Sequence, residues 1–340
     1  IIMTRASPIM EFLTGIMIAF LIYAAAILIS NEEIEVSNFF SFLAAMMLAY
    51  QPVRSLATVN ITIQQGLAGA RKVLPIIDEM PEIRDKQNVK NLEYINGEII
   101  FEDVNFDYSD EDKILKSINL KFPGKKMTAL VGHSGSGKST IVDLLLGLIK
   151  PISGSILLDD LPLNQKNILQ WQKNLGFVPQ NIFLADTSIK QNIAFGIDEH
   201  AIDEKKIQHA SDLANIMDFV SKLPLGLDTQ VGERGLQLSG GQIQRIGIAR
   251  ALYENPNVLI FDEATSALDG SSEKLIMQSI NNFYGKKTVI IVAHRLDTIK
   301  NVDNILFCDD GRIIDQGSYA DLMARNEIFQ SMAGKVQGVS

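Results

Sequence analysis

The feature that most constrains this chain is a glycine-rich loop at residues 132–140, Gly-His-Ser-Gly-Ser-Gly-Lys-Ser-Thr. The apolar run 127–131 before it predicts a buried strand, and residues 139–148 place apolar side chains on one helix face. Such a loop lets backbone N–H groups converge on phosphate oxygens, and the helix directs its positive end at them. The sequence therefore predicts a nucleoside triphosphate site, with Lys138 on the β- and γ-phosphates and Ser139 on Mg²⁺. The loop residues expected to contact the nucleotide are Gly132, Ser134, Gly135, Gly137, Lys138, Ser139 and Thr140.

Two later segments carry matching chemistry. The apolar run 258–261 ends in Asp262, which is placed to join the Mg²⁺ shell, and Glu263, which is placed to act as general base on the attacking water. A helical pattern extends to about Leu252 from a Ser-Gly-Gly-Gln start, whose serine can cap the helix while its glycines expose N–H groups. The sequence thus predicts a second anion-binding helix terminus, formed by Ser239, Gly240, Gly241 and Gln242.

Charge and cysteine content exclude several classes of protein. The chain has 31 basic and 40 acidic residues, a net charge of −9. We expect no nucleic-acid partner, because neutralising phosphates requires clustered lysine and arginine. The single cysteine, Cys308, excludes an intrachain disulfide and a cysteine-based zinc site, and its apolar neighbours predict a core position.

The first eighty residues differ in composition from the rest. Residues 12–29 and 36–53 are uncharged runs, and each approaches the ~20 residues that cross a bilayer core of ~30 Å. The connection between them is acidic, whereas arginine and lysine follow the second run. Two membrane helices with their basic ends in the cytoplasm are therefore predicted. Buried core helices are the alternative interpretation.

The pattern along the chain predicts three parts. The second helix continues beyond the membrane to about Met80, so a partial transmembrane domain is expected at residues 1–80. A polar linker follows at 81–97, and alternating strands and helices predict an α/β domain at 98–337. Two membrane helices cannot enclose a pathway, and the chain starts within an apolar segment. We therefore expect a C-terminal part of a longer membrane protein.

These motifs, in this order, resemble the ATP-binding cassette (ABC) exporters. By that resemblance Tyr108 stacks on adenine, Gln180 touches Mg²⁺ and the attacking water, and His294 lies near the γ-phosphate. Asp269 ends the loop 266–269 through which two such domains communicate. Residues 229–235 resemble the exporter segment that contacts intracellular helices.

The resemblance implies a fold and an assembly. It implies an α/β P-loop NTPase (ABC ATPase) domain after two transmembrane helices of an all-α membrane domain, with ATP and Mg²⁺ bound. It also implies a head-to-tail homodimer, in which residues 239–242 of one copy complete the loop site of the other. Since every motif is intact, two competent sites are expected.

A narrower resemblance concerns the substrate. Residues 5–11, 39–54 and 64–70 resemble the last two membrane helices of bacterial lipid A exporters. The expected function is ATP-driven movement of an amphipathic lipid, lipid A or its core-linked form, across the bacterial inner membrane. The protein would be multi-pass, with its nucleotide domain in the cytoplasm.

Three alternatives remain open at the level of sequence. A multidrug exporter has the same nucleotide domain, and a peptide or protein exporter fits less well because no protease or docking domain is visible. A soluble ABC ATPase acting in repair or translation belongs to another class, and the two uncharged runs argue against it.

Overall fold

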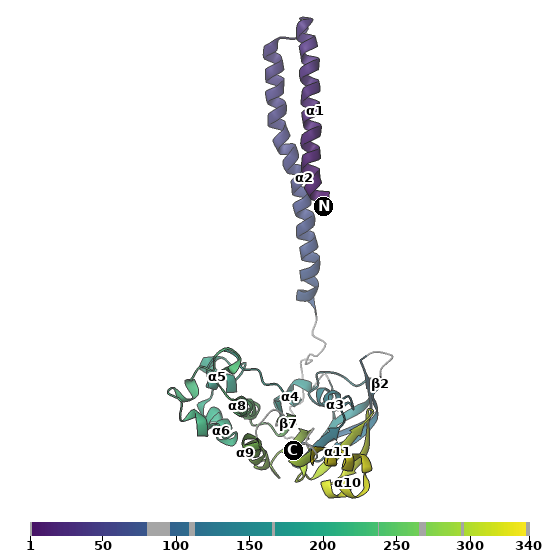
Figure 1. The fold of residues 1–340 in the computed structure, drawn as a ribbon, viewed down its shortest axis with the longest axis vertical. Coiled ribbons are helices and arrows are strands. Elements are labelled where there is room, and N and C mark those ends of the chain that lie inside the picture. Colours follow the sequence, from purple (N-terminus) through teal and green to yellow (C-terminus); the bar gives the residue numbers. More distant parts are fainter. Residues whose placement is uncertain are drawn as a thin grey trace. The chain divides into compact units, whose positions relative to one another are not determined.

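The computed structural model describes residues 2–79, 96–108, 113–164, 167–236, 238–264, 270–293 and 296–337 (Figure 1). These residues divide into two compact units, Ile1–Pro81 and Glu82–Ser340.

The first unit is a hairpin of two helices, α1 (Ile2–Ser30) and α2 (Val36–Asp78), which lie side by side (Figure 1). Its apolar side chains face outward: Phe12 is 70% exposed and Leu48 is 77% exposed. Among its described side chains, Ala25 alone is a buried hydrophobic residue. The hairpin therefore has no core of its own, as expected for helices whose surroundings are apolar.

Membrane-crossing length is met by one stretch in the described part of the chain. Glu11–Ser30 is 20 residues long with a mean hydropathy of 2.6, and at 1.5 Å per residue it covers about 30 Å. Within the described residues, the apolar part of α2 is Val36–Tyr50, which covers about 22 Å. The helix itself continues through Pro52 and Pro75 to Asp78, close to the expected end at Met80.

The second unit contains a six-stranded sheet with the order β10-β9-β3-β8-β7-β6. Its strands are β3 (Met127–Gly132), β6 (Leu175–Val178), β7 (Val258–Asp262), β8 (Thr288–Val292), β9 (Asn304–Asp309) and β10 (Arg312–Gly317). All neighbouring pairs are parallel except β9 and β10. Every residue of β3 and β8 is buried, so the centre of this sheet is covered on both faces.

A four-stranded antiparallel sheet packs beside it, with the order β2-β1-β4-β5. Its strands are β1 (Ile99–Asp107), β2 (Lys113–Phe122), β4 (Ser153–Leu158) and β5 (Leu161–Pro162). The helices α3 (Lys138–Leu145) and α4 (Ile168–Lys173) share a core with this sheet. Trp171 of α4 is fully buried, and its indole N–H donates to the Leu145 carbonyl at 2.6 Å, so it anchors α4 on α3.

A group of helices forms the second core around α8 (Gly240–Leu252), which contacts α5, α6 and β6 (Figure 1). The helices of this region are α5 (Ile189–Ile193), α6 (Glu204–Leu213), α7 (Met217–Val220) and α9 (Gly270–Asn281). Short 3₁₀ turns lie at η1 (Glu199–Ala201), η2 (Gly226–Asp228), η3 (Glu233–Gly235) and η4 (Leu296–Ile299).

The C-terminal region contains two consecutive helices, α10 (Tyr319–Arg325) and α11 (Glu327–Gln337). Asn326 separates them, because its side-chain oxygen accepts the Phe329 N–H at 2.9 Å and begins a new helix. Phe329 is fully buried and packs edge-on against Phe307 of β9.

Candidate nucleotide-binding site

The predicted site residues gather where the parallel strands end. β3 ends at Gly132, and the phosphate loop (residues 132–140) follows. Glu263, directly after β7, donates its N–H to the Val292 carbonyl at 3.0 Å, and Ala293 after β8 donates to Leu130 of β3 at 3.2 Å. The ends of β7, β8 and β3 are therefore adjacent. This is the edge of an open parallel sheet at which ligands bind.

Two glycines shape the phosphate loop. A Cβ on Gly132 would lie 2.1 Å from the carbonyl oxygen of Cys308 in the neighbouring strand β9. Gly137 is the N-cap of α3 with φ +96°, and a Cβ there would lie 2.7 Å from Leu115. Both positions therefore require glycine, for space at the first and for backbone conformation as well at the second.

The Lys138 side chain folds back onto the start of the phosphate loop. Its side chain is buried, and Nζ donates to the carbonyl oxygens of Gly132 at 2.9 Å and His133 at 2.8 Å. Burial lowers the pKa of Lys138 below its ordinary value, and the nearby negative groups, among them Glu263, oppose this effect. A desolvated ammonium group at the mouth of a glycine-rich loop has the charge and location to receive phosphate oxygens.

The residue predicted as general base, Glu263, and the glutamine predicted to assist it, Gln180, are in direct contact. Gln180, two residues after β6, donates its amide Nε2 to Glu263 Oε2 at 2.8 Å. Glu263 has φ +48°, a left-handed conformation that costs a non-glycine residue roughly 1–2 kcal/mol. A strained backbone at the end of a strand is typical of residues whose side chain must be aimed at a reacting group.

The oxygen donors suit a magnesium ion. Ser139 lies in the first turn of α3, Asp262 ends β7, and Gln180 contacts the residue after Asp262. In the described part of the chain no three His, Cys, Asp or Glu residues cluster as a metal cage. Magnesium ordinarily takes one or two carboxylates, waters and substrate phosphates, so this donor set fits it.

The Ser-Gly-Gly segment (residues 239–242) begins α8 at the surface. Ser239 Oγ accepts the Gln242 N–H at 3.3 Å, and Gln242 Oε1 accepts the Ser239 N–H at 2.8 Å, which forms a capping box. Ser239 and Gly240 are exposed, whereas Gly241 is buried. The side chain of Gln242 thus serves its own helix in this structure, while the exposed N-terminus remains accessible to an anion.

The other predicted residues are placed as follows. Tyr108 is 63% exposed after β1, with its ring edge-on to Phe106 at 4.9 Å. Ser134 and Gly135 are exposed at the tip of the phosphate loop, and Thr140 is buried in α3. Asp269 and His294 lie outside the described residues.

The sequence interpretation did not include two residues of the site, one within the phosphate loop and one beside it. Ser136 is buried, with Oγ 3.4 Å from Lys138 Nζ. Cys308 supplies the carbonyl against Gly132, and burial raises the pKa of its thiol to about 12. The loop spacing could have indicated Ser136, whereas Cys308 depends on the pairing of β9 with β3, which no local pattern specifies.

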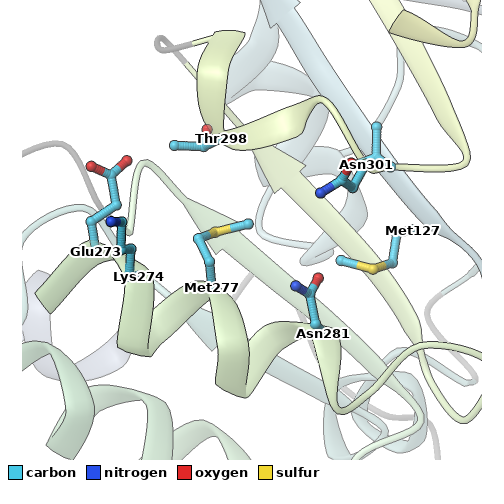
Figure 2. Close-up of a pocket in the computed structure, with 8 residues that line it drawn as sticks. Met127, Glu273, Lys274, Met277, Asn281, Thr298 and Asn301 are labelled. Atoms are coloured by element: carbon cyan, nitrogen blue, oxygen red, sulfur yellow. The ribbon is translucent and has the colours of Figure 1, made fainter. Parts of the chain in front are cut away.

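A separate cavity of ≈ 320 Å³ lies between α9, the residues around η4 and the start of β3 (Figure 2). It is lined by Met127, Glu273, Lys274, Met277, Asn281, Thr298, Asn301 and Val302. Met127 begins β3 and Gly132 ends it, so this cavity contains none of the predicted nucleotide-site residues and lies toward the other end of that strand.

Comparisons with known proteins identify a family and relatives for the chain. Residues 115–266 match the ABC transporter family. The chain is 41% identical over 324 residues to an ATP-dependent lipid A-core flippase of Desulfotalea psychrophila, covering 95% of this chain and 56% of that protein. It is 40% identical over 327 residues to the uncharacterized ABC transporter ATP-binding protein y4gM of Sinorhizobium fredii, covering 96% of this chain and 56% of that protein.

A solved structure is also similar. A bacterial Atm1-family ABC exporter with ATP bound superposes with a TM-score of 0.78 at 34% identity, over 97% of this chain and 58% of that one. These matches include both the helical hairpin and the sheet-containing unit, and the chain spans a little over half the length of the proteins that it matches.

Proposed function

This chain contains an ABC transporter domain, and from that premise we propose that it is the ATP-hydrolysing part of an exporter that moves an amphipathic lipid across a membrane. The observation that carries the proposal is that one chain joins an apolar helical hairpin without a core to a strand-end site with a phosphate loop. The similarity to lipid A-core flippases over 95% of the chain supports a lipid as the substrate. We propose the domain limits 1–80, 81–97 and 98–337 for the membrane part, the linker and the nucleotide domain.

The phosphate loop binds the triphosphate of ATP. The exposed backbone at Ser134 and Gly135 contacts phosphate oxygens, and Thr140 supports the first turn of α3 from its buried position. Lys138 exchanges its contacts with two loop carbonyls for contacts with the β- and γ-phosphates. Tyr108 presents an exposed ring on which adenine stacks.

Hydrolysis uses the pair formed by Gln180 and Glu263. Glu263 accepts a proton from the attacking water, and Gln180 orients that water. His294 donates a hydrogen bond to the transferring phosphoryl group. Ser139, Asp262 and Gln180 would hold Mg²⁺, which supplies charge stabilisation to the phosphates when bound.

Two copies of the chain close around the nucleotide. The Ser-Gly-Gly segment of each copy presents its exposed helix N-terminus to the ATP that is bound by the other. Asp269 lies in the loop by which the two domains communicate. Both sites hydrolyse ATP, because each copy carries Glu263 and an intact phosphate loop.

Closing and opening of this homodimer moves the membrane helices. The substrate class that we propose is lipid A or its core-linked form, exposed to the outer side of the bacterial inner membrane while the nucleotide domain remains in the cytoplasm. The apolar stretch Glu11–Ser30 and the basic residues after the apolar part of α2 support this orientation.

Substrate-stimulated ATP hydrolysis tests the proposal. The full-length protein is placed in lipid vesicles, and phosphate release is measured with lipid A or with amphipathic drugs. We expect lipid A to raise the rate by more than the drugs do. Stimulation by drugs alone would replace the lipid with a multidrug substrate, and recovery of the protein in the soluble fraction without detergent would overturn the transporter function.

A further inference from the structure

We propose that Arg250 is a positioning residue that joins helix α8 to the segment leaving Gln180, so that the Ser-Gly-Gly segment and Gln180 move together. The inference rests on the proposed function, in which the Ser-Gly-Gly segment acts on the ATP of the other copy and Gln180 acts on the ATP of its own copy. It assigns a specific side chain to the link between them.

Helix α8 contacts the chain after Gln180 at two points about one turn apart. Gly247 packs against Ile182 so closely that a Cβ would lie 2.1 Å from Ile182 Cδ1. Three residues later, the Arg250 guanidinium donates from Nη1 to the Phe183 carbonyl at 2.9 Å. The two residues Ile182 and Phe183 are thus fixed to α8, and they follow Gln180 almost directly.

Arg250 also binds α5 from the same guanidinium. Nε donates to the Asn192 carbonyl at 2.8 Å, and Nη2 donates to Asn192 Oδ1 at 3.2 Å. The guanidinium carbon lies 4.7 Å from the centre of the Phe195 ring. The planar group therefore donates to two backbone carbonyls and one side-chain amide oxygen in fixed directions. A lysine ammonium cannot reproduce this geometry.

Asn192 makes the segment rigid enough to transmit a movement. Its side chain is fully buried, Oδ1 accepts the Ala185 N–H at 2.9 Å, and Nδ2 donates to the Ala185 and Ser188 carbonyls and to Thr187 Oγ1. A buried polar network in which every group has a partner fixes one conformation. The loop between Phe183 and α5 is consequently closed around Asn192, and Arg250 binds the residue at its centre.

The same segment reaches the loop predicted to contact intracellular helices. Ser188 and Gln230 form an antiparallel bridge, the Ile189 N–H donates to the Thr229 carbonyl at 3.0 Å, and the Val231 N–H donates to the Thr187 carbonyl at 3.0 Å. A displacement of α8 therefore reaches residues 229–231 as well as Gln180. Because Gln180 donates to Glu263 at 2.8 Å, that displacement acts on the general base.

Arg245 provides a matched control on the same helix. Its Nη1 donates to the Asn215 carbonyl at 2.9 Å, and its guanidinium carbon lies 5.2 Å from the Phe219 ring. Both arginines therefore combine carbonyl contacts with an aromatic ring. Arg245, however, fastens α8 to the chain around α7, and Arg250 fastens it to the segment after Gln180.

The test is a double-mutant cycle on ATP hydrolysis by the full-length protein in lipid vesicles. We expect Arg250→Gln to lower kcat at least ~10-fold with the KM for ATP changed less than about 2-fold, because misplacing a reacting group slows chemistry strongly. Combined with Gln180→Ala, it should lower kcat no further than Gln180→Ala alone. Arg245→Gln should leave kcat near the native value, and its effect should multiply with that of Gln180→Ala.

Hydrogen exchange on the same variants separates positioning from general loss of structure. Amides of residues 183–195 should exchange faster in Arg250→Gln, and those near residues 215–219 should exchange faster in Arg245→Gln. Arg250→Lys should recover kcat only in part, since a compact ammonium on a flexible stem does not reproduce the fixed geometry of the guanidinium donors. The inference is wrong if the effects of the Arg250 and Gln180 substitutions on kcat multiply in the double variant. It is also wrong if Arg245→Gln lowers kcat as much as Arg250→Gln does. If the native protein hydrolyses no ATP, the proposed function itself fails.

Discussion

At the scale of single residues, Glu263 and Lys138 hold opposite charges at one sheet edge, and different interactions restrain each side chain. Glu263 is aimed by a left-handed backbone and by the amide of Gln180. Lys138 is held by two carbonyl oxygens in a buried loop. The orientation of Glu263 is thus set by the protein's own backbone and by Gln180, and such preorganisation lowers the reorganisation needed for catalysis.

Replacing the general base should separate binding from hydrolysis. We expect Glu263→Gln to bind ATP and to hydrolyse it at least ~100-fold more slowly, because an amide cannot accept the proton of the attacking water. Phosphate release and nucleotide binding are measured on the same preparation. The control is Glu254→Gln, an exposed residue paired with Lys206, which should hydrolyse ATP near the native rate. A native rate in the Glu263 variant would refute the assigned role.

The buried ammonium of Lys138 should link nucleotide binding to pH. Burial lowers its pKa below 10.5 in the nucleotide-free protein, and bound phosphates raise it again because they favour the charged form. At alkaline pH between these two pKa values, binding therefore takes up a proton, and the affinity for ATP falls as the pH rises.

Calorimetry in buffers of different ionisation enthalpy measures this uptake. Lys138→Met should bind ATP more weakly and should lose the uptake that belongs to the lysine. Identical proton uptake in the native protein and the variant would show that another group titrates.

At the scale of elements, strands β3 and β9 fix the geometry of the phosphate loop. Gly132 pairs with Cys308, and a Cβ on Gly132 would meet the Cys308 carbonyl, which belongs to the strand backbone and cannot move aside. Gly135 has φ +80°, but a Cβ there would meet no atom within 4 Å. The two glycines therefore differ in kind, the first limited by space and the second by conformation.

This difference predicts unequal effects of alanine. Gly132→Ala should destabilise the protein by about 1–3 kcal/mol and abolish ATP binding, because the strand or the loop must shift. Gly135→Ala should cost about 1–2 kcal/mol, the price of a left-handed conformation alone. Thermal unfolding and nucleotide binding of the two variants test this. A larger loss of stability at Gly135, or intact ATP binding in Gly132→Ala, would contradict the role of Cys308.

Local pattern predicted the elements better than their ends and contacts. The apolar runs before Gly132 and Asp262 gave the strands β3 and β7 correctly, because a buried parallel strand reads as a continuous apolar run. The helix after the loop ends at Leu145, short of the predicted residue 148. Gly147 adopts φ +67° there, where a Cβ would strike Ile168. The Leu148 N–H donates to the Asp143 carbonyl at 3.0 Å across this glycine, so Gly147 is a local helix stop that the sequence interpretation did not use.

The contact between Gln180 and Glu263 could not be predicted from local sequence. The two residues are 83 positions apart, and they meet because β6 and β7 pair in the sheet. The motif positions marked each residue as functional, but the hydrogen bond depends on strand order. Similarly, the capping role of the Gln242 side chain was predictable from its spacing to Ser239. Its place in the segment 239–242 instead led to the prediction of a nucleotide contact.

At the scale of the whole molecule, each of the two units exposes groups that need a partner, apolar side chains in one and backbone N–H groups in the other. The hairpin exposes its apolar side chains and lacks a core, whereas the sheet-containing unit has two cores and an exposed helix N-terminus at Ser239. In the proposed function, lipid or other membrane helices cover the hairpin, and an anion binds at the exposed helix N-terminus. In the proposed homodimer that anion is the ATP held by another copy, so the assembly and the chemistry depend on the same bound molecule.

Cross-linking between two differently tagged copies tests this arrangement directly. One copy carries Ser134→Cys in the phosphate loop and the other carries Ser239→Cys, so a disulfide can form only between chains when their Cβ atoms come within about 4 Å. Both positions are exposed, and the native Cys308 is buried with a thiol pKa of about 12, so it does not compete. ATP in the hydrolysis-deficient Glu263→Gln background should raise the yield of the mixed dimer strongly. Pairing Ser134→Cys with Ser221→Cys, an exposed position after α7, gives the background yield, and a nucleotide-independent or equal yield for the two pairs would refute the head-to-tail homodimer.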